Sequence, residues 1–214
     1  MSESELSELR REYAVGGLSE QDLADDPITM FRSWMHDAVV AGLHEPNAVV
    51  VSTATPSGVP SSRTVLLKGL DDRGFVFFTN YASRKGVELS QNPVCALLFP
   101  WHDLERQVRV EGVAEQLTQE ENDAYFATRP RGSQLGAWAS PQSEVVADRA
   151  GLDLRYAEVA ARFGDSEVPT PPLWGGYLVA AGDVEFWQGR RGRMHDRLRY
   201  RRTADGWVTD RLAP

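Results

Sequence analysis

The sequence predicts a mainly β protein of the α+β class, an antiparallel barrel flanked by helices. From residue 48 onward, short β-rich runs follow one another and are separated by turn residues such as those at 56–58 and 71–74. The few helical patterns stand between these runs without the regular strand–helix alternation of a parallel sheet. A Rossmann-type dinucleotide fold is therefore not expected.

Length and composition favour one domain. The chain has 214 residues, 42% of them hydrophobic, which is enough for one sizeable core. We expect a single domain over 1–214 with a mobile, Ser- and Glu-rich arm at about 1–12. The chain shows no apolar run of membrane-spanning length and no basic-then-apolar start, so we expect a cytoplasmic protein. The single cysteine, Cys95, lies in an apolar run and is expected to be a buried thiol.

Helix signals are local and specific. Asp26 followed by Pro27 is typical of a helix start, and Thr118 with Glu121 forms a capping box. Pro130 should end the helix that this box opens. Helices are predicted at about 27–42, 83–89, 118–129 and 144–163.

The strand predictions follow the β-rich runs. Hairpin turns, including Asp205-Gly206, separate several of them. The predicted strands are 48–54, 62–67, 75–79, 94–100, 107–117, 176–180, 184–188, 196–202 and 207–212.

Charge argues against a polymeric anionic partner. The net charge is −8, which would repel nucleic acid and anionic membranes at long range. Positive charge is nevertheless concentrated locally, with seven arginines between Arg190 and Arg202. Such clusters favour small anions as ligands, although a solvated charged face is the plain alternative for any one of them.

Several chemistries have no motif in the sequence. It contains no glycine-rich dinucleotide or P-loop fingerprint, no paired cysteines, no HExxH and no GxSxG. Its four histidines lack ligand-like spacing, so we expect no metal.

Two segments combine cations and hydroxyls near strand ends. Strand alternation would place Arg63 and Lys68 on opposite faces unless a bulge intervenes, so that they would serve two different anions. At 79–85 a strand end leads into a helix start, where hydroxyls, free N–H groups and two cations could bind a phosphate. A plain helix cap is an equally good reading of that spacing.

Two further patterns are suggestive. Tyr125 and Arg129 would share one helix face if the helix persists. If residues 193–197 are extended, Arg193, His195 and Arg197 project from one face, where such crowded cations would call for an anion or an electron-rich partner. A charged edge strand explains the second pattern equally well.

Longer motifs identify a family. The chain is similar to the pyridoxamine 5′-phosphate oxidase family along nearly its whole length, from 10–13 to 211–214. The matching segments are 45–48, 63–69, 79–86, 106–110, 129–134, 136–140, 174–177 and 185–189. The resemblance implies a split-barrel FMN-binding fold, a homodimer, and oxidation of pyridoxine or pyridoxamine 5′-phosphate by dioxygen to pyridoxal 5′-phosphate.

The resemblance also implies site residues. FMN contacts fall on Arg63, Thr64, Val65, Leu66, Leu67, Lys68, Phe78, Thr79, Arg84 and Lys85. The other subunit would add Gln107, Gln142, Ser143, Trp187 and Arg197. Substrate contacts fall on Arg10, Tyr13, Lys68, Tyr125, Arg129, Ser133, Arg193 and His195. By the same resemblance Arg193 and His195 face the pyridine ring and are the catalytic candidates, with a general-base role for His195 left open.

The sequence departs from the family pattern at two places. Phe78 stands where a tyrosine is common, and Pro141 interrupts the run before Gln142. A related reductase or oxidase with a deazaflavin or another small substrate is the alternative function, and a non-enzymatic vitamer-binding or FMN-storage protein is a third reading. The full set of substrate-phosphate residues argues against the former, and the pair Arg193 and His195 argues against the latter.

Overall fold

The computed structural model describes residues 12–13 and 16–214, and its contacts divide the chain into two compact units. The first unit comprises Met1–Val49, Leu97–Glu111 and Ala181–Pro214, and the second comprises Val50–Ala96 and Gly112–Ala180. Arg10 and most of the predicted N-terminal arm lie outside the described residues, and the single-domain expectation stays a prediction.

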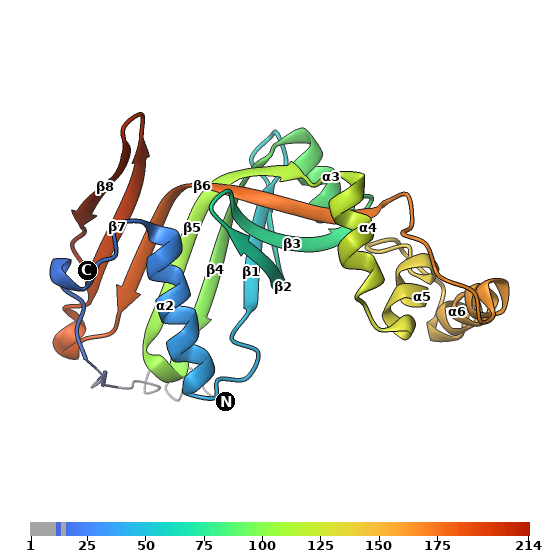
Figure 1. Ribbon diagram of the computed structural model, residues 1–214, viewed down its shortest axis with the longest axis horizontal. Coiled ribbons are helices and arrows are strands. Elements are labelled where there is room, and N and C mark those ends of the chain that lie inside the picture. The colour runs from blue at the N-terminus through green and yellow to red at the C-terminus, as the bar shows by residue number, and fades with distance from the viewer. Residues whose placement is uncertain (1–11, 14–15) are drawn as a thin grey trace. The chain divides into compact units, whose positions relative to one another are not determined.

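The strands form one sheet that closes into a barrel (Figure 1). Its order is β3-β2-β1-β4-β5-β6-β7-β8, and β3 also pairs with β6, which closes a six-stranded antiparallel barrel. This confirms the predicted mainly β architecture. The strands are β1 (Ala48–Ala54), β2 (Pro60–Asp71), β3 (Gly74–Asn80), β4 (Val94–Trp101), β5 (Arg106–Gln116), β6 (Trp174–Gln188), β7 (Asp196–Thr203) and β8 (Gly206–Arg211).

Strand prediction erred in one place. The two strands expected at 176–180 and 184–188 are one continuous strand, β6. Gly182 lies between them, but the residues that follow it continue into an antiparallel pairing with β7. A glycine therefore need not end a strand when its neighbours keep ladder partners.

The helices are α2 (Pro27–Val40), α3 (Arg84–Gln91), α4 (Gln119–Ala127), α5 (Arg131–Ala139) and α6 (Arg149–Phe163), with short 3-10 turns at Glu20–Asp22, His102–Leu104 and Arg191–Arg193. The Asp26 cap and the capping box at Thr118 are confirmed. Helix α4 ends at Ala127, before the predicted residue 129, and Pro130 stands directly before α5, which the sequence reading missed. Asp148 caps α6, so that helix begins later than the predicted residue 144.

Helix α3 begins close against the turn that follows β3, and this approach positions the first turn of the helix. A Cβ on Gly86 would lie 2.2 Å from the backbone oxygen of Tyr81, a distance that no larger residue tolerates. Ser83 caps the helix through the backbone N–H of Gly86. The residues just inside the helix, Arg84 and Lys85, are thereby held beside the end of β3.

In the first unit, α2 packs through its aromatic residues. Phe31 contacts the ring of Phe99 at 4.7 Å between centroids, and Trp34 contacts Phe186 edge-on at 5.1 Å. In the second unit, Cys95 is buried, and burial raises the pKa of its thiol to about 12, as expected for a structural cysteine. Among the described residues, none of the helices is both long and apolar enough to span a membrane.

Candidate functional site

The second unit contains a cleft of about 760 Å³ that brings together many of the predicted site residues. Strands β2 and β3, helix α3, and the segment from α4 to Gln142 contribute to its wall. The predicted residues that line it are Thr64, Val65, Leu66, Lys68, Phe78, Thr79, Lys85, Tyr125, Arg129, Ser133 and Gln142. Leu67 of β2, in contrast, is buried in the core.

Lys85 is the buried cation of this cleft, with only 7% of its surface exposed. Its Nζ donates to Thr79 Oγ1 at 3.0 Å, to Ser83 Oγ at 3.3 Å and to Gln142 Oε1 at 3.0 Å. Burial, with a smaller contribution from Arg63, lowers the pKa of Lys85 to about 8. A bound anion would favour the charged amine and raise that pKa again.

Gln142 lies on the same chain as Lys85. Its Oε1 also accepts a hydrogen bond from Thr79 Oγ1 at 3.0 Å. The resemblance assigned Gln142 to the other subunit, and that assignment stays a prediction, while within one chain Gln142 contacts the unit that carries Lys85. Ser143 follows with a backbone φ of 74°, in the left-handed region, and so turns the chain directly after this contact.

Two further cations, Lys68 and Arg129, line the same cleft. The register of β2 against β3 shifts between Leu67 and Gly69, so the bulge that the sequence reading allowed for is present at Lys68. The guanidinium of Arg129 lies over the Trp174 ring at 4.5 Å, and its Nη1 is buried with no hydrogen-bond partner in the described chain. Burial lowers the pKa of Arg129. An unsatisfied buried cationic donor is costly, and an anion in the cleft would satisfy it.

Aromatic rings pack against one another beside Arg129 in the cleft. Phe78 stacks on Tyr125 at 3.8 Å and on Trp174 at 5.2 Å between ring centroids. Phe78 therefore packs as an apolar ring against two other aromatic residues. Ser133 lies in the first turn of α5, whose N-terminus has no side-chain cap, so that backbone N–H groups stand close to the cleft.

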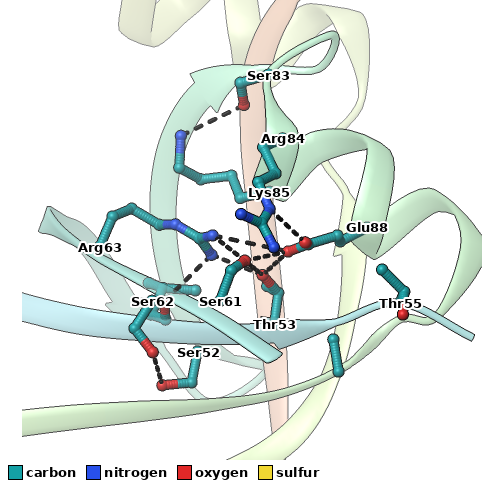
Figure 2. Close-up of polar contacts among 12 residues, drawn as sticks. Ser52, Thr53, Thr55, Ser61, Ser62, Arg63, Ser83, Arg84, Lys85 and Glu88 are labelled. Atoms are coloured by element: carbon teal, nitrogen blue, oxygen red, sulfur yellow. Dashed lines mark hydrogen bonds and ion pairs between the residues drawn. The ribbon is translucent and has the colours of Figure 1, made fainter. Parts of the chain in front are cut away.

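Arg63 and Arg84 converge on a residue that the sequence reading missed (Figure 2). Glu88 accepts a hydrogen bond from Arg84 Nε at 2.9 Å, and Arg63 Nη2 lies 3.6 Å from its other oxygen. Neither arginine lines the cleft described above. The spacing of Arg84 and Glu88, one helical turn apart, was the signal that could have revealed this ion pair.

The remaining predicted residues belong to the first unit. Tyr13 contacts His195 edge-on at 5.4 Å between centroids, and Trp187 lies 4.7 Å from the same imidazole. The backbone N–H of Arg190 donates to Nδ1 of His195 at 3.1 Å. A neutral imidazole held in this way carries its proton on Nε2, where it can donate but cannot accept a proton.

The proposed alternation of Arg193, His195 and Arg197 is wrong. Arg193 ends a 3-10 turn with a backbone φ of 62°, and β7 begins only at Asp196. Glycine at 192 also has positive φ, so the chain turns here instead of extending. Arg197 pairs with the buried Glu185 through two hydrogen bonds of 2.7 and 3.0 Å. Gln107 lies half-buried on β5.

Two family models match the chain. The model described as pyridoxamine 5′-phosphate oxidase matches residues 35–163, and the model described as the pyridoxine 5′-phosphate oxidase C-terminal dimerisation region matches residues 174–214.

Curated relatives match over the full length. A protein of Nocardioides sp. is 62% identical over 214 residues, covering 100% of both chains. A protein of Rubrobacter xylanophilus is 59% identical and covers 98% of this chain and 97% of its own. Both are named pyridoxine/pyridoxamine 5′-phosphate oxidase.

Solved structures agree in fold. PhzG from Burkholderia lata, in complex with tetrahydrophenazine-1-carboxylic acid, has a TM-score of 0.88 at 35% identity, covering 94% of this chain and 99% of its own. An FMN-binding protein from Nostoc punctiforme, related to pyridoxamine 5′-phosphate oxidase, has a TM-score of 0.70 at 16% identity, covering 90% and 100%. The second likeness concerns the fold alone.

The lowered pKa of Lys85 predicts pH-dependent anion binding. At pH 7 the amine is charged before and after an anion binds, whereas at pH 9 it must first take up a proton. Affinity for sulfate, which is a dianion at both pH values, should therefore fall about tenfold from pH 7 to pH 9. Sulfate-dependent thermal shifts of the flavin-free chain, referenced to chloride at equal ionic strength, measure this. Lys85→Arg should abolish the pH dependence, and an equal decline in that variant would assign it to another group.

The contact at Nδ1 predicts one tautomer of His195. ¹⁵N NMR of the flavin-free protein above pH 8 should show an unprotonated Nδ1 and a protonated Nε2. The exposed His36 serves as an internal reference that is free to populate both tautomers. Finding the proton of His195 on Nδ1 would contradict the contact and restore Nε2 as a possible base.

Proposed function

The chain belongs to the pyridoxamine 5′-phosphate oxidase family, and from this premise we propose that it oxidises pyridoxine 5′-phosphate and pyridoxamine 5′-phosphate to pyridoxal 5′-phosphate. FMN is the proposed cofactor and dioxygen the electron acceptor, which gives hydrogen peroxide and, from the amine, ammonia. The observation that carries the substrate assignment is the buried Arg129 Nη1, left without an acceptor in the same cleft as Lys68. A phosphate monoester supplies the missing acceptors.

The residues present fit the phosphate of FMN at the start of α3, where Thr79 and Lys85 line the cleft and Arg63 and Arg84 lie outside its lining. Arg84 and Lys85 occupy the first turn of α3, where the helix dipole disfavours positive charge. A phosphate there would be held by charge-assisted hydrogen bonds from these cations, with Arg63 and Thr79 beside them. Bound flavin would supply the two-electron chemistry that no side chain of the protein can provide.

The substrate phosphate fits the part of the cleft that Lys68 and Arg129 line. Lys68 and Arg129 are two cations in one cleft, and Lys68 forms no ion pair or hydrogen bond with the rest of the described chain. Ser133 and Tyr125 add hydroxyl groups to the same wall. An anchor remote from the reacting carbon orients the substrate, which converts binding energy into correct alignment of the reacting groups.

The first unit is proposed to contribute the groups that face the pyridine ring. Arg193 and His195 are assigned to substrate positioning, with the Nε2–H of His195 as a hydrogen-bond donor. The match of residues 174–214 to a dimerisation region supports a homodimer. We therefore propose that each active site combines residues such as Arg63 from one subunit with Trp187 and Arg197 from the other.

A direct assay tests the function. The purified protein should be yellow and release FMN on denaturation, and with pyridoxine 5′-phosphate in air it should form an aldehyde and peroxide. A released deazaflavin would favour a related reductase, and bound FMN without turnover would favour a storage role. Turnover of a tricyclic carboxylic acid of the kind bound by PhzG, but not of either phosphate ester, would place the substrate outside the B6 vitamers.

Arg129→Ala should impair the use of phosphorylated substrate while leaving FMN affinity nearly unchanged. Losing a charge-assisted phosphate contact should cost on the order of 2 kcal/mol in transition-state stabilisation, seen as a fall in kcat/KM. The matched control is Arg131→Ala, because Arg131 bonds to the backbone oxygens of Ser166 and Gly164 and does not line this cleft. Equal losses of substrate and FMN affinity would show that the two anion sites are not separate.

Mixed dimers test the shared site. Arg63→Ala and Arg197→Ala homodimers should each be impaired, whereas a heterodimer should contain one site with both changes and one intact site. Activity recovered after the two variants are unfolded and refolded together, with the heterodimer confirmed by mass, supports sharing. Heterodimers as inactive as the parents would place both arginines in the site of a single chain.

A further inference from the structure

Glu88 is a buried carboxylate at the centre of a polar cluster that joins β1, β2 and α3 (Figure 2). Only 3% of its surface is exposed. Burial alone would raise its pKa, but hydrogen bonds from Ser61, Thr53 and Arg84 lower the pKa to about 2. The carboxylate is therefore charged at every pH at which the protein would be studied.

The two oxygens of Glu88 serve two different guanidiniums. Oε1 accepts from Arg84 Nε at 2.9 Å. Oε2 accepts from the hydroxyl of Ser61 at 2.5 Å and from that of Thr53. Those same hydroxyls accept from Arg63, Thr53 Oγ1 at 2.6 Å from Nη1 and Ser61 Oγ from Nη2. Arg63 is thus linked to the carboxylate through a pair of hydroxyl bridges.

These contacts use only part of each guanidinium. Nη1 of Arg63 also donates to the backbone oxygen of Val51 at 3.3 Å, so its two Nη groups are engaged within the cluster. Arg84 uses Nε alone, and its Nη1 and Nη2 form no hydrogen bond to any other described residue. Because a guanidinium is planar, fixing one edge also fixes the direction of the other donors.

The cluster also offsets charge repulsion. Burial is the main cause that lowers the pKa of Arg63 and of Lys85, and a neighbouring cation lowers each further, Arg84 for Arg63 and Arg63 for Lys85. The three cations therefore crowd one another. The negative charge of Glu88 compensates part of this repulsion before any ligand binds. A neutral residue at 88 would leave the cations free to separate and to turn away from one another.

We propose that Glu88 is a positioning residue of the phosphate end of the cofactor site, a buried counter-ion that holds Arg63 and Arg84 in the orientation in which they receive a phosphate monoester. Glu88 itself does not line the cleft. The proposal rests on the proposed FMN function and names the residue that sets the geometry of its phosphate contacts.

Glu88→Gln tests this most sharply because it keeps the shape and removes the charge. The side-chain NH₂ of glutamine is a donor and would face groups that now donate to the carboxylate of Glu88. One of the two arginines would therefore lose its contact with residue 88. Dissociation constants of FMN and of riboflavin, which lacks the phosphate, are measured by flavin fluorescence with the flavin-free full chain. We expect FMN affinity to fall at least about tenfold while riboflavin affinity changes by less than about twofold.

Two further variants control the experiment. Glu121→Gln removes another carboxylate of the same unit, one that lies 2.9 Å from Arg73 and does not line the cleft. This variant should leave the ratio of FMN affinity to riboflavin affinity unchanged. Glu88→Asp keeps the charge on a shorter arm and should recover part of the ratio. If Glu88→Gln does not fold, Glu88→Asp carries the comparison, because it too should lose FMN selectively.

Each other outcome overturns the proposal. Equal losses of FMN and riboflavin affinity would make Glu88 a structural link between α3 and the β1–β2 hairpin. Tighter FMN binding would make Glu88 a competitor of the phosphate for the arginines. The proposed function fails separately, since a wild-type chain that prefers FMN but does not oxidise pyridoxine 5′-phosphate would leave the role of Glu88 intact.

Discussion

The candidate site depends on a concentration of positive charge that the fold must hold together without a ligand. Arg63, Arg84 and Lys85 lie near the start of α3, and Glu88 is the buried carboxylate that joins the two arginines. Such an arrangement is stable only when every cation has an acceptor. Lys85 meets this condition with three neutral oxygens, which is why burial depresses its pKa, whereas Arg63 and Arg84 meet it with a full negative charge.

Barrel closure places these groups. The pairing of β3 with β6 sets Thr79 opposite Gly175 and Asn80 opposite Trp174, so the end of β3 and the start of β6 lie side by side. Thr79 supports Lys85 there, while Trp174 lies beneath Arg129. A single strand pairing therefore holds the residues beside Lys85 and Arg129 on one ladder. Precise positioning of this kind is what an enzyme needs if remote phosphate contacts are to orient a substrate.

The same scaffold can serve different substrates. PhzG shares the fold and was solved with a tricyclic carboxylic acid, whereas the curated relatives are named for vitamers that carry a phosphate. Fold alone therefore does not decide between such activities. In this chain the discriminating feature is local, because Lys68 and the buried Nη1 of Arg129 leave cationic donors available in the cleft. A phosphate dianion suits those donors better than a single carboxylate does.

The sequence by itself determined the strand-rich architecture, the caps of α2 and α4, the buried thiol of Cys95 and, through long motifs, the family. These features depend on neighbours along the chain, where periodicity and capping chemistry act directly. Tertiary structure decided the rest. It showed that β6 is one strand, that α5 follows Pro130, that Arg193 lies in a turn, and that Glu88 gathers two arginines. Contacts such as that between Glu88 and the Ser61 hydroxyl join residues distant in sequence, and no local pattern encodes which buried charge will face which donor until the barrel has closed.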